Sequence, residues 1–357
     1  MNSHAIWLEP PRGGYPEGSA ASLLGIDRAR AWLKGEIPLP PMARLIGLRL
    51  VEVGAGTATF NLPASNWLLW NTGGFGAGAF ALAADAALSG ALLTTLPAGV
   101  GLTTSESSLS FLRQARPGTT FIARGRTIHA ARSTGLSEVY IEDSRGRLLA
   151  HGSSRCIFVP IPPNPATRPS CPGNSESTPD PYQRPHVGGL PQDFYDRTPG
   201  NVIIRRYIAG EIPPHPVAEL TGIEMLEGAD GKATVSLPAT EWLSNSNGQV
   251  YGGFIELLAD AATSTAIGST SETPSMALAT LDLKVYFLRP VQPDGRTLTA
   301  RAEVVQRGRT IALANCRVTN ADGKTVAMAT SHSMIVPNRP VSLLQETQLA
   351  DEAPPLT

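Results

Sequence analysis

Residues 245–262 read NSNGQVYGGFIELLADAA and residues 70–87 read WNTGGFGAGAFALAADAA, so a similar apolar stretch with a single aspartate appears twice. Two further pairs match: GEIP begins at Gly35 and Gly210, and LPA begins at Leu62 and Leu237. All three pairs are 175 positions apart (84 to 259, 35 to 210 and 62 to 237), whereas chance matches would scatter over many offsets. The sequence therefore predicts two copies of one fold.

Length, charge and cysteine content limit the class of protein. The 357 residues suffice for two domains that each bury a core, and a net charge of −1 argues against nucleic acid or a membrane surface as the partner. Three cysteines without zinc spacing and an N-terminus unlike a signal peptide favour a cytoplasmic protein without a metal site.

Composition divides the chain into five segments. Proline, with Ser, Asn and Gly, becomes frequent between the copies, which is typical of an extended linker, and both ends of the chain look similar. We expect a loose N-terminal segment, a first domain, a linker, a second domain and a loose tail at residues 1–25, 26–160, 161–200, 201–338 and 339–357.

Each copy shows the same order of predicted elements. Short helices precede an alternating strand such as Lys232–Leu237, and a long apolar helix then begins near Gly78 or Gly253. Aspartate within this stretch argues for a buried helix of a soluble protein rather than a membrane span. Several alternating strands follow, so we expect an α+β fold in which an antiparallel sheet wraps around the long helix.

A Gly-Gly pair and an aspartate give the long helix of the second copy a chemical character. Gly252 and Gly253 let a ligand approach the helix start, where unpaired N–H groups can stabilise a developing oxyanion. Asp260 lies within the apolar helix, where burial raises a carboxyl pKa. Such an acid also arises by pairing with a buried Arg, but Asp85 repeats it in the first copy. The repetition favours a functional carboxylate.

These residues resemble a known family. Asn245, the Tyr251-Gly252-Gly253 turn, Asp260 and Thr280 have the spacing of hotdog-fold acyl-CoA thioesterases of the phenylacetate-pathway (PaaI-like) type, in the 4-hydroxybenzoyl-CoA thioesterase superfamily. The resemblance covers about 130 residues in each copy. It implies a double hotdog, equivalent to the homodimer of the family, that hydrolyses an acyl thioester. It also implies a helical Asp as nucleophile or general base, and no cofactor apart from the coenzyme A of the substrate.

The resemblance further implies two composite sites, because sites of this family lie across the interface between two folds. One site would combine helix-start residues of the second copy with the acid of the first, and the other site the reverse. The first set is Asn245, Tyr251, Gly252 and Gly253 with Asp85, Ser89 and Thr104; the second is Trp70, Gly76 and Ala77 with Asp260, Ser264 and Thr280.

Two departures from the family pattern affect these sites. Tyr251 stands at the usual His position, which removes an imidazole but leaves the backbone donors and adds a phenol. In the first copy, Trp70 replaces the Asn and Gly76-Ala77 replaces the His-Gly part of the turn. We therefore expect the site that contains Asp85 to be the more active one.

Simpler roles remain open for several of these residues. Asn245 is also a typical turn residue, the serines and threonines are common packing residues, and Glu256 is explained as a local charge because the first copy has Ala81 there. Arg307, Gly308, Arg309 and Arg132 lie in predicted turns, where they either bind coenzyme A phosphates or are solvated.

The nature of the ligand and the activity also remain open. An acyl carrier protein is an alternative thiol carrier, and homo-oligomers of double-hotdog units are compatible with the sequence. The alternatives to a thioesterase are an acyl-CoA binding protein without turnover and a hotdog hydratase or dehydratase.

Overall fold

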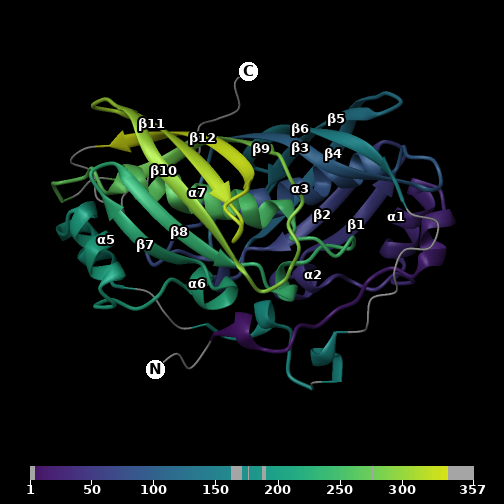
Figure 1. Cartoon of the computed structure of the whole chain (residues 1–357), viewed down its shortest axis with the longest axis horizontal. Coiled ribbons are helices and arrows are strands. Elements are labelled where there is room, and N and C mark those ends of the chain that lie inside the picture. The colour runs from purple at the N-terminus through teal and green to yellow at the C-terminus, as the bar shows by residue number, and fades with distance from the viewer. Residues whose placement is uncertain (1–4, 162–170, 176, 187–189, 275–276, 337–357) are drawn as a thin grey trace.

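A computed structural model of the chain describes residues 5–161, 171–175, 177–186, 190–274 and 277–336. Within them, one antiparallel sheet of 12 strands, in the order β1-β2-β4-β5-β6-β3-β9-β12-β11-β10-β8-β7, curves over two long helices (Figure 1). The first copy forms one half of the sheet and the second copy the other. This arrangement confirms the predicted α+β fold with two fused repeats.

The two copies have the same order of elements. In the first, the bounds are α1 Gly25–Leu33, α2 Pro41–Ile46, β1 Arg49–Gly54, β2 Thr57–Pro63, α3 Ala77–Leu93, β3 Val100–Phe111, β4 Thr120–Ala130, β5 Thr134–Glu142 and β6 Leu148–Pro160. In the second, they are α5 Gly200–Ile208, α6 Pro216–Thr221, β7 Glu224–Ala229, β8 Lys232–Pro238, α7 Gly252–Gly268, β9 Ala277–Phe287, β10 Thr297–Arg307, β11 Ile311–Thr319 and β12 Thr325–Val336. The sequence indicated β2 and β8 but missed their partners β1 and β7.

The halves join through β3 and β9 and through the packing of α3 on α7. β3 and β9 pair from Glu106↔Tyr286 to Ser110↔Asp282, which makes the sheet continuous. Two glycines allow the helices to touch: a Cβ on Gly78 would lie 2.5 Å from Cα of Leu257, and one on Gly253 would lie 3.0 Å from Cα of Leu82. This crossing places the start of each long helix beside the middle of the other.

The long helices are buried on almost every side, which explains why their sequences are apolar all round rather than amphipathic. In α3 the only residues that are not buried are Ser89, Gly90 and Leu93. Alanine dominates this helix because the sheet on one side and α7 on the other leave little room for side chains. Among the described residues, no helix is both long and apolar enough to cross a membrane.

The N-terminal segment and the linker differ from the loose segments that composition suggested. Ile6 is buried, and the backbone carbonyl of Glu9 accepts a hydrogen bond from Nε1 of Trp242 at 2.9 Å. In the linker, a short helix α4 (Gln192–Arg197) carries the buried Tyr195. A few anchoring side chains therefore hold segments whose average composition is polar. The tail at residues 339–357 lies outside the described residues.

Candidate active sites between the two copies

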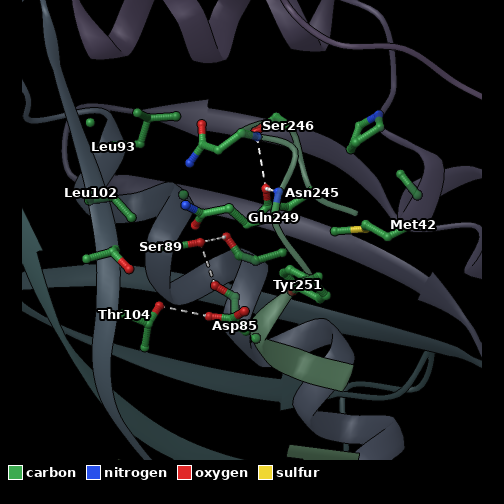
Figure 2. A pocket seen from close by; sticks show the side chains of 18 of the residues that line it. Met42, Asp85, Ser89, Leu93, Leu102, Thr104, Asn245, Ser246, Gln249 and Tyr251 are labelled. Carbon is green, nitrogen blue, oxygen red and sulfur yellow. Dashed lines mark hydrogen bonds between the residues drawn. The ribbon is translucent and has the colours of Figure 1, made fainter. Parts of the chain in front are cut away.

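Asp85 occupies the middle of α3, where it meets the start of α7 from the other copy. Its Oδ1 accepts a hydrogen bond from Oγ1 of Thr104 at 3.1 Å (Figure 2). Its Oδ2 accepts one from the backbone N–H of Gly253 at 3.2 Å. The residue is only 6% exposed. Donors from both copies thus fix the orientation of a buried carboxyl.

The start of α7 leaves one backbone donor beside this carboxyl. The N–H of Tyr251 donates to the carbonyl of Leu243 at 2.9 Å, and the N–H of Gly253 donates to Asp85. In the described part of the chain the N–H of Gly252, between them, has no acceptor. A Cβ on Gly252 would lie 2.7 Å from Oδ2 of Asp85, so glycine is required for the close approach. The free donor lies at the positive end of the helix dipole.

Asp260 forms the pseudo-symmetric site in α7. Its Oδ2 accepts the N–H of Gly78 at 2.9 Å, and its Oδ1 accepts Oγ1 of Thr280 at 3.3 Å and Oγ of Ser264 at 3.4 Å. The N–H of Ala77, which corresponds to Gly252, lies near this carboxylate and lowers its pKa. Like the N–H of Gly252, that of Ala77 has no hydrogen-bond acceptor among the described residues, so the clearest difference between the two turns is Trp70 in place of Asn245.

Burial tunes both acids in the same direction. It raises the pKa of Asp85 to about 6, against the lowering effect of the hydrogen bonds from Thr104 and Gly253. It likewise raises the pKa of Asp260 to about 6. A carboxyl with such a pKa is mostly ionised at neutral pH, yet it is basic enough to accept a proton from water.

Glu256 adds a second carboxyl to the Asp85 site alone. It is 1% exposed, and its Oε2 has no hydrogen-bond partner among the described residues. Burial, and then the charge of Asp85, raise the pKa of Glu256 well above its ordinary value, while Ser107 acts in the opposite direction. Both effects favour the protonated form of Glu256, and so favour Asp85 as the ionised member of the pair.

The raised pKa values predict an unusual dependence of stability on pH. The pKa of each carboxyl rises from 3.8 to about 6 on folding, so the folded state binds the carboxyl proton more tightly than the unfolded state does. The free energy of unfolding should therefore fall as the pH rises from about 4 to about 6, by about 3 kcal/mol for each carboxyl. Asp85→Asn or Asp260→Asn should reduce this fall and raise the melting temperature at neutral pH.

Thermal denaturation at a series of pH values checks this prediction. Glu256 contributes with the same sign, so each single variant should retain part of the slope. Parallel curves for the variants and the original protein would show that neither carboxyl has the raised pKa.

A cavity of about 590 Å³ extends from Asp85 toward the surface between α1, β1 and β3. Asp85, Tyr251 and Gly252 lie at its polar end. Much of its apolar wall is aliphatic, and the rings of Trp32, Phe60 and Phe287 complete it; the aliphatic residues include Met42, Leu48, Leu50, Leu93 and Leu102. A second cavity of about 690 Å³ extends from Asp260. Each aspartate therefore lies in a cavity built from both copies.

Three predicted residues have contacts that the sequence did not specify. The phenol of Tyr251 donates to the carbonyl of Leu82 at 2.9 Å and joins the two copies, so it is already engaged. Oδ1 of Asn245 accepts the N–H groups of Asn247 at 2.9 Å and Gln249 at 3.2 Å, and thereby closes the turn that lines the cavity. Oγ of Ser89 bonds to the carbonyl of Asp85 at 2.6 Å rather than to its carboxylate.

The predicted phosphate-binding residues lie apart from the cavities. Among the described residues, Arg132, Arg307, Gly308 and Arg309 do not line either cavity. Basic side chains do line the Asp85 cavity, namely Arg28, Lys34, Arg49 and Arg289. No sequence pattern linked these four side chains to one another, because they come from separate elements that only the fold brings together.

Comparisons with known proteins agree with this architecture. A family model described as the thioesterase superfamily matches residues 77–150 and again residues 247–327. The acyl-coenzyme A thioesterase PaaI of Escherichia coli is 32% identical over 111 residues, which cover 31% of this chain and 76% of PaaI. A candidate esterase of Caenorhabditis elegans is 35% identical over 106 residues, which cover 29% of this chain and 61% of the worm protein.

A solved structure matches both halves together. A protein of unknown function with a hot dog fold from Alicyclobacillus acidocaldarius has a TM-score of 0.50 at 14% identity, and the match covers 80% of this chain and 95% of that protein. This likeness concerns the fold, whereas the identity to PaaI and the repeated family match establish kinship. The chain therefore belongs to the thioesterase superfamily and carries two hotdog folds in one polypeptide.

Proposed function

We propose that the protein hydrolyses an acyl thioester, with acyl-CoA as the substrate, at the site formed by Asp85 and the start of α7. The observation that carries this proposal is the free N–H of Gly252 next to the oriented carboxylate of Asp85. A thioester carbonyl bound at this N–H places its carbon beside the carboxylate. Membership of the thioesterase superfamily supports the same reaction.

The proposed reaction uses Asp85 in one of two ways. As a general base, it takes a proton from water while the oxygen of that water adds to the carbonyl carbon. As a nucleophile, it adds to the carbon itself and forms an anhydride, which water then hydrolyses. In both routes the N–H of Gly252 stabilises the oxyanion, the C–S bond breaks, and the thiolate leaves and is protonated. In ¹⁸O-labelled water, label enters the carboxyl of Asp85 only by the nucleophilic route, when water attacks the Asp85 carbonyl carbon of the anhydride, so labelled Asp85 would identify that route.

The shape of the Asp85 cavity supports an acyl substrate. Its mainly aliphatic walls suit an acyl chain, and Asp85 and Gly252 lie together at its polar end. The basic side chains Arg28, Lys34, Arg49 and Arg289 suit the phosphates of coenzyme A. We keep Arg307, Gly308, Arg309 and Arg132 as candidates for the part of coenzyme A that projects beyond the cavity, and an acyl carrier protein as the alternative carrier.

Thiol release from a panel of acyl-CoAs tests the proposal. We expect free thiol from at least one member of a panel that spans short, long and aromatic acyl groups, and we expect the rate to persist in the presence of a chelator. A hydratase or dehydratase would change the acyl chain without releasing thiol, and a binding protein would do neither. Binding without thiol release across the whole panel would overturn the proposal.

A further inference from the structure

The two cavities are not copies of each other. Residues 175 positions apart occupy equivalent places in the two copies. The Asp260 cavity has Trp70, His215 and, from the linker, Tyr195, and the equivalent residues are Asn245, Pro40 and Ala20. Trp70, Tyr195 and His215 line the Asp260 cavity together with Phe80, Phe111 and Tyr207. Aromatic side chains therefore form much of the wall of this cavity. The polar groups of His215 and Tyr195 have no equivalent in the Asp85 cavity.

His215 presents a fixed hydrogen-bond donor. Its Nδ1 accepts the backbone N–H of Asn71 at 3.0 Å, and burial lowers the pKa of His215 to about 3. The ring is therefore neutral at physiological pH, with its proton on Nε2. The ring stacks on that of Tyr207, with 4.5 Å between the ring centroids, and makes an edge contact with Trp70, with 4.8 Å between the centroids. These two contacts hold it in place. Within the described residues this Nε2 has no partner, although His215 is only 7% exposed.

Tyr195 presents a second donor of the same kind. It is 4% exposed, and its hydroxyl also has no partner in the described part of the chain. Burying a hydrogen-bond donor without an acceptor destabilises the fold, because the donor loses its hydrogen bond to water. Two unsatisfied donors in the wall of one cavity indicate that an acceptor on a ligand completes them.

We propose that the Asp260 cavity binds an acyl thioester whose acyl group carries a hydrogen-bond acceptor oxygen, recognised by Nε2–H of His215 and the hydroxyl of Tyr195. The Asp85 cavity, which has Pro40 and mainly aliphatic walls instead, takes a plain acyl chain. The two sites of one chain thus select different acyl groups. This inference rests on the proposed function only for the identity of the ligand as an acyl thioester.

Non-hydrolysable S-alkyl coenzyme A thioethers test the inference without turnover. In a matched series, an ether oxygen replaces one methylene of the alkyl chain at successive positions, which adds an acceptor but no donor. The full-length protein is labelled with 5-fluorotryptophan, which marks its five tryptophans. In ¹⁹F NMR, Trp70 reports on the Asp260 cavity and Trp32 on the Asp85 cavity, with Trp70→Phe and Trp32→Phe used to assign the two signals.

We expect one position of the ether oxygen to tighten binding at the Trp70 signal by between about twofold and tenfold relative to the plain alkyl chain. At the Trp32 signal the ether should bind no more tightly than the alkyl chain. Tyr195→Phe removes only the unpaired hydroxyl, so it should abolish most of the preference while leaving the melting temperature unchanged or raised. His215→Phe provides the second test, and Tyr140→Phe, at an exposed tyrosine outside both cavities, is the control.

Equal binding of the alkyl chain and of every ether at the Trp70 signal would overturn the inference. A preference that survives both Tyr195→Phe and His215→Phe, or no binding of any thioether at the Trp70 signal, would overturn it as well. Each of these results leaves thiol release at the Asp85 site unaffected. A failure of this inference is therefore distinguishable from a failure of the proposed function.

Discussion

Asp85→Asn is expected to lower the rate of thiol release by a factor on the order of one hundred or more. The amide keeps the shape of the carboxyl and accepts the N–H of Gly253, but it neither takes a proton from water nor attacks the carbonyl carbon. The loss should appear in kcat rather than in KM, because the substituted group acts on the transition state. Circular dichroism should confirm that the fold is unchanged.

Asp260→Asn is the matched variant, and it should have a smaller effect on the same substrate. Asp260 has a similar burial and pKa, but the bulky indole of Trp70 lies beside the start of α3, at the position that Asn245 occupies in the other site. That site is consequently less open to a thioester carbonyl. If Asp260→Asn abolishes thiol release while Asp85→Asn leaves it intact, the assignment of the more active site is wrong.

Gly252→Ala is the second substitution with a large expected effect. The added Cβ would lie 2.7 Å from Oδ2 of Asp85 and 3.5 Å from Cε1 of Phe287, so the carboxylate or the helix start must move. Gly252 does not have a positive φ, and the backbone therefore accommodates alanine without strain. We expect folding to be retained and kcat to fall by a factor on the order of ten to one hundred, since the geometry of donor and acid is disturbed.

Gly76→Ala provides a comparable change in the other site, where the counterpart of Gly252 is already an alanine, Ala77. Its Cβ would lie 2.4 Å from Nε1 of Trp70 and 3.0 Å from Oδ2 of Asp260, while the Asp85 site stays intact. Turnover of a plain acyl-CoA should therefore remain close to that of the original protein. Comparable kinetic constants for Gly252→Ala and the original protein would contradict the proposed role of the α7 start.

Local sequence patterns predicted the architecture well because each pattern occurs in both copies, and the second occurrence supports the first. The duplicated aspartate and Gly-rich turn located both long helices, and alternating residues located most strands. The outer strands β1 and β7 were missed because their exposure is high on both faces, which removes the alternation. Anchors such as Trp242 on Glu9 were also not predictable, since single long-range contacts leave no periodic signal.

Only those site residues that belong to the repeated motif could be predicted from the sequence. The family resemblance implied that each acid meets the helix start of the other copy, with Gly76 and Ala77 expected beside Asp260. The hydrogen bond to Asp85 comes from Gly253, whereas the one to Asp260 comes from Gly78, which was not among the expected residues. The engagement of Tyr251 with Leu82 depends on how α3 and α7 cross. His215 and Tyr195 were not identified because they lie in a turn and in the linker, and only tertiary packing brings them to Asp260.

The most direct test of the central claim compares thiol release by the original protein with that of the double variant Asp85→Asn/Asp260→Asn. The substrate is the best acyl-CoA of the panel, and binding of the same acyl-CoA is measured in parallel. The account predicts rapid thiol release by the original protein, and release near background by a double variant that still binds the acyl-CoA. A double variant that releases thiol at the original rate would contradict it, because neither helical carboxylate would then be needed for hydrolysis.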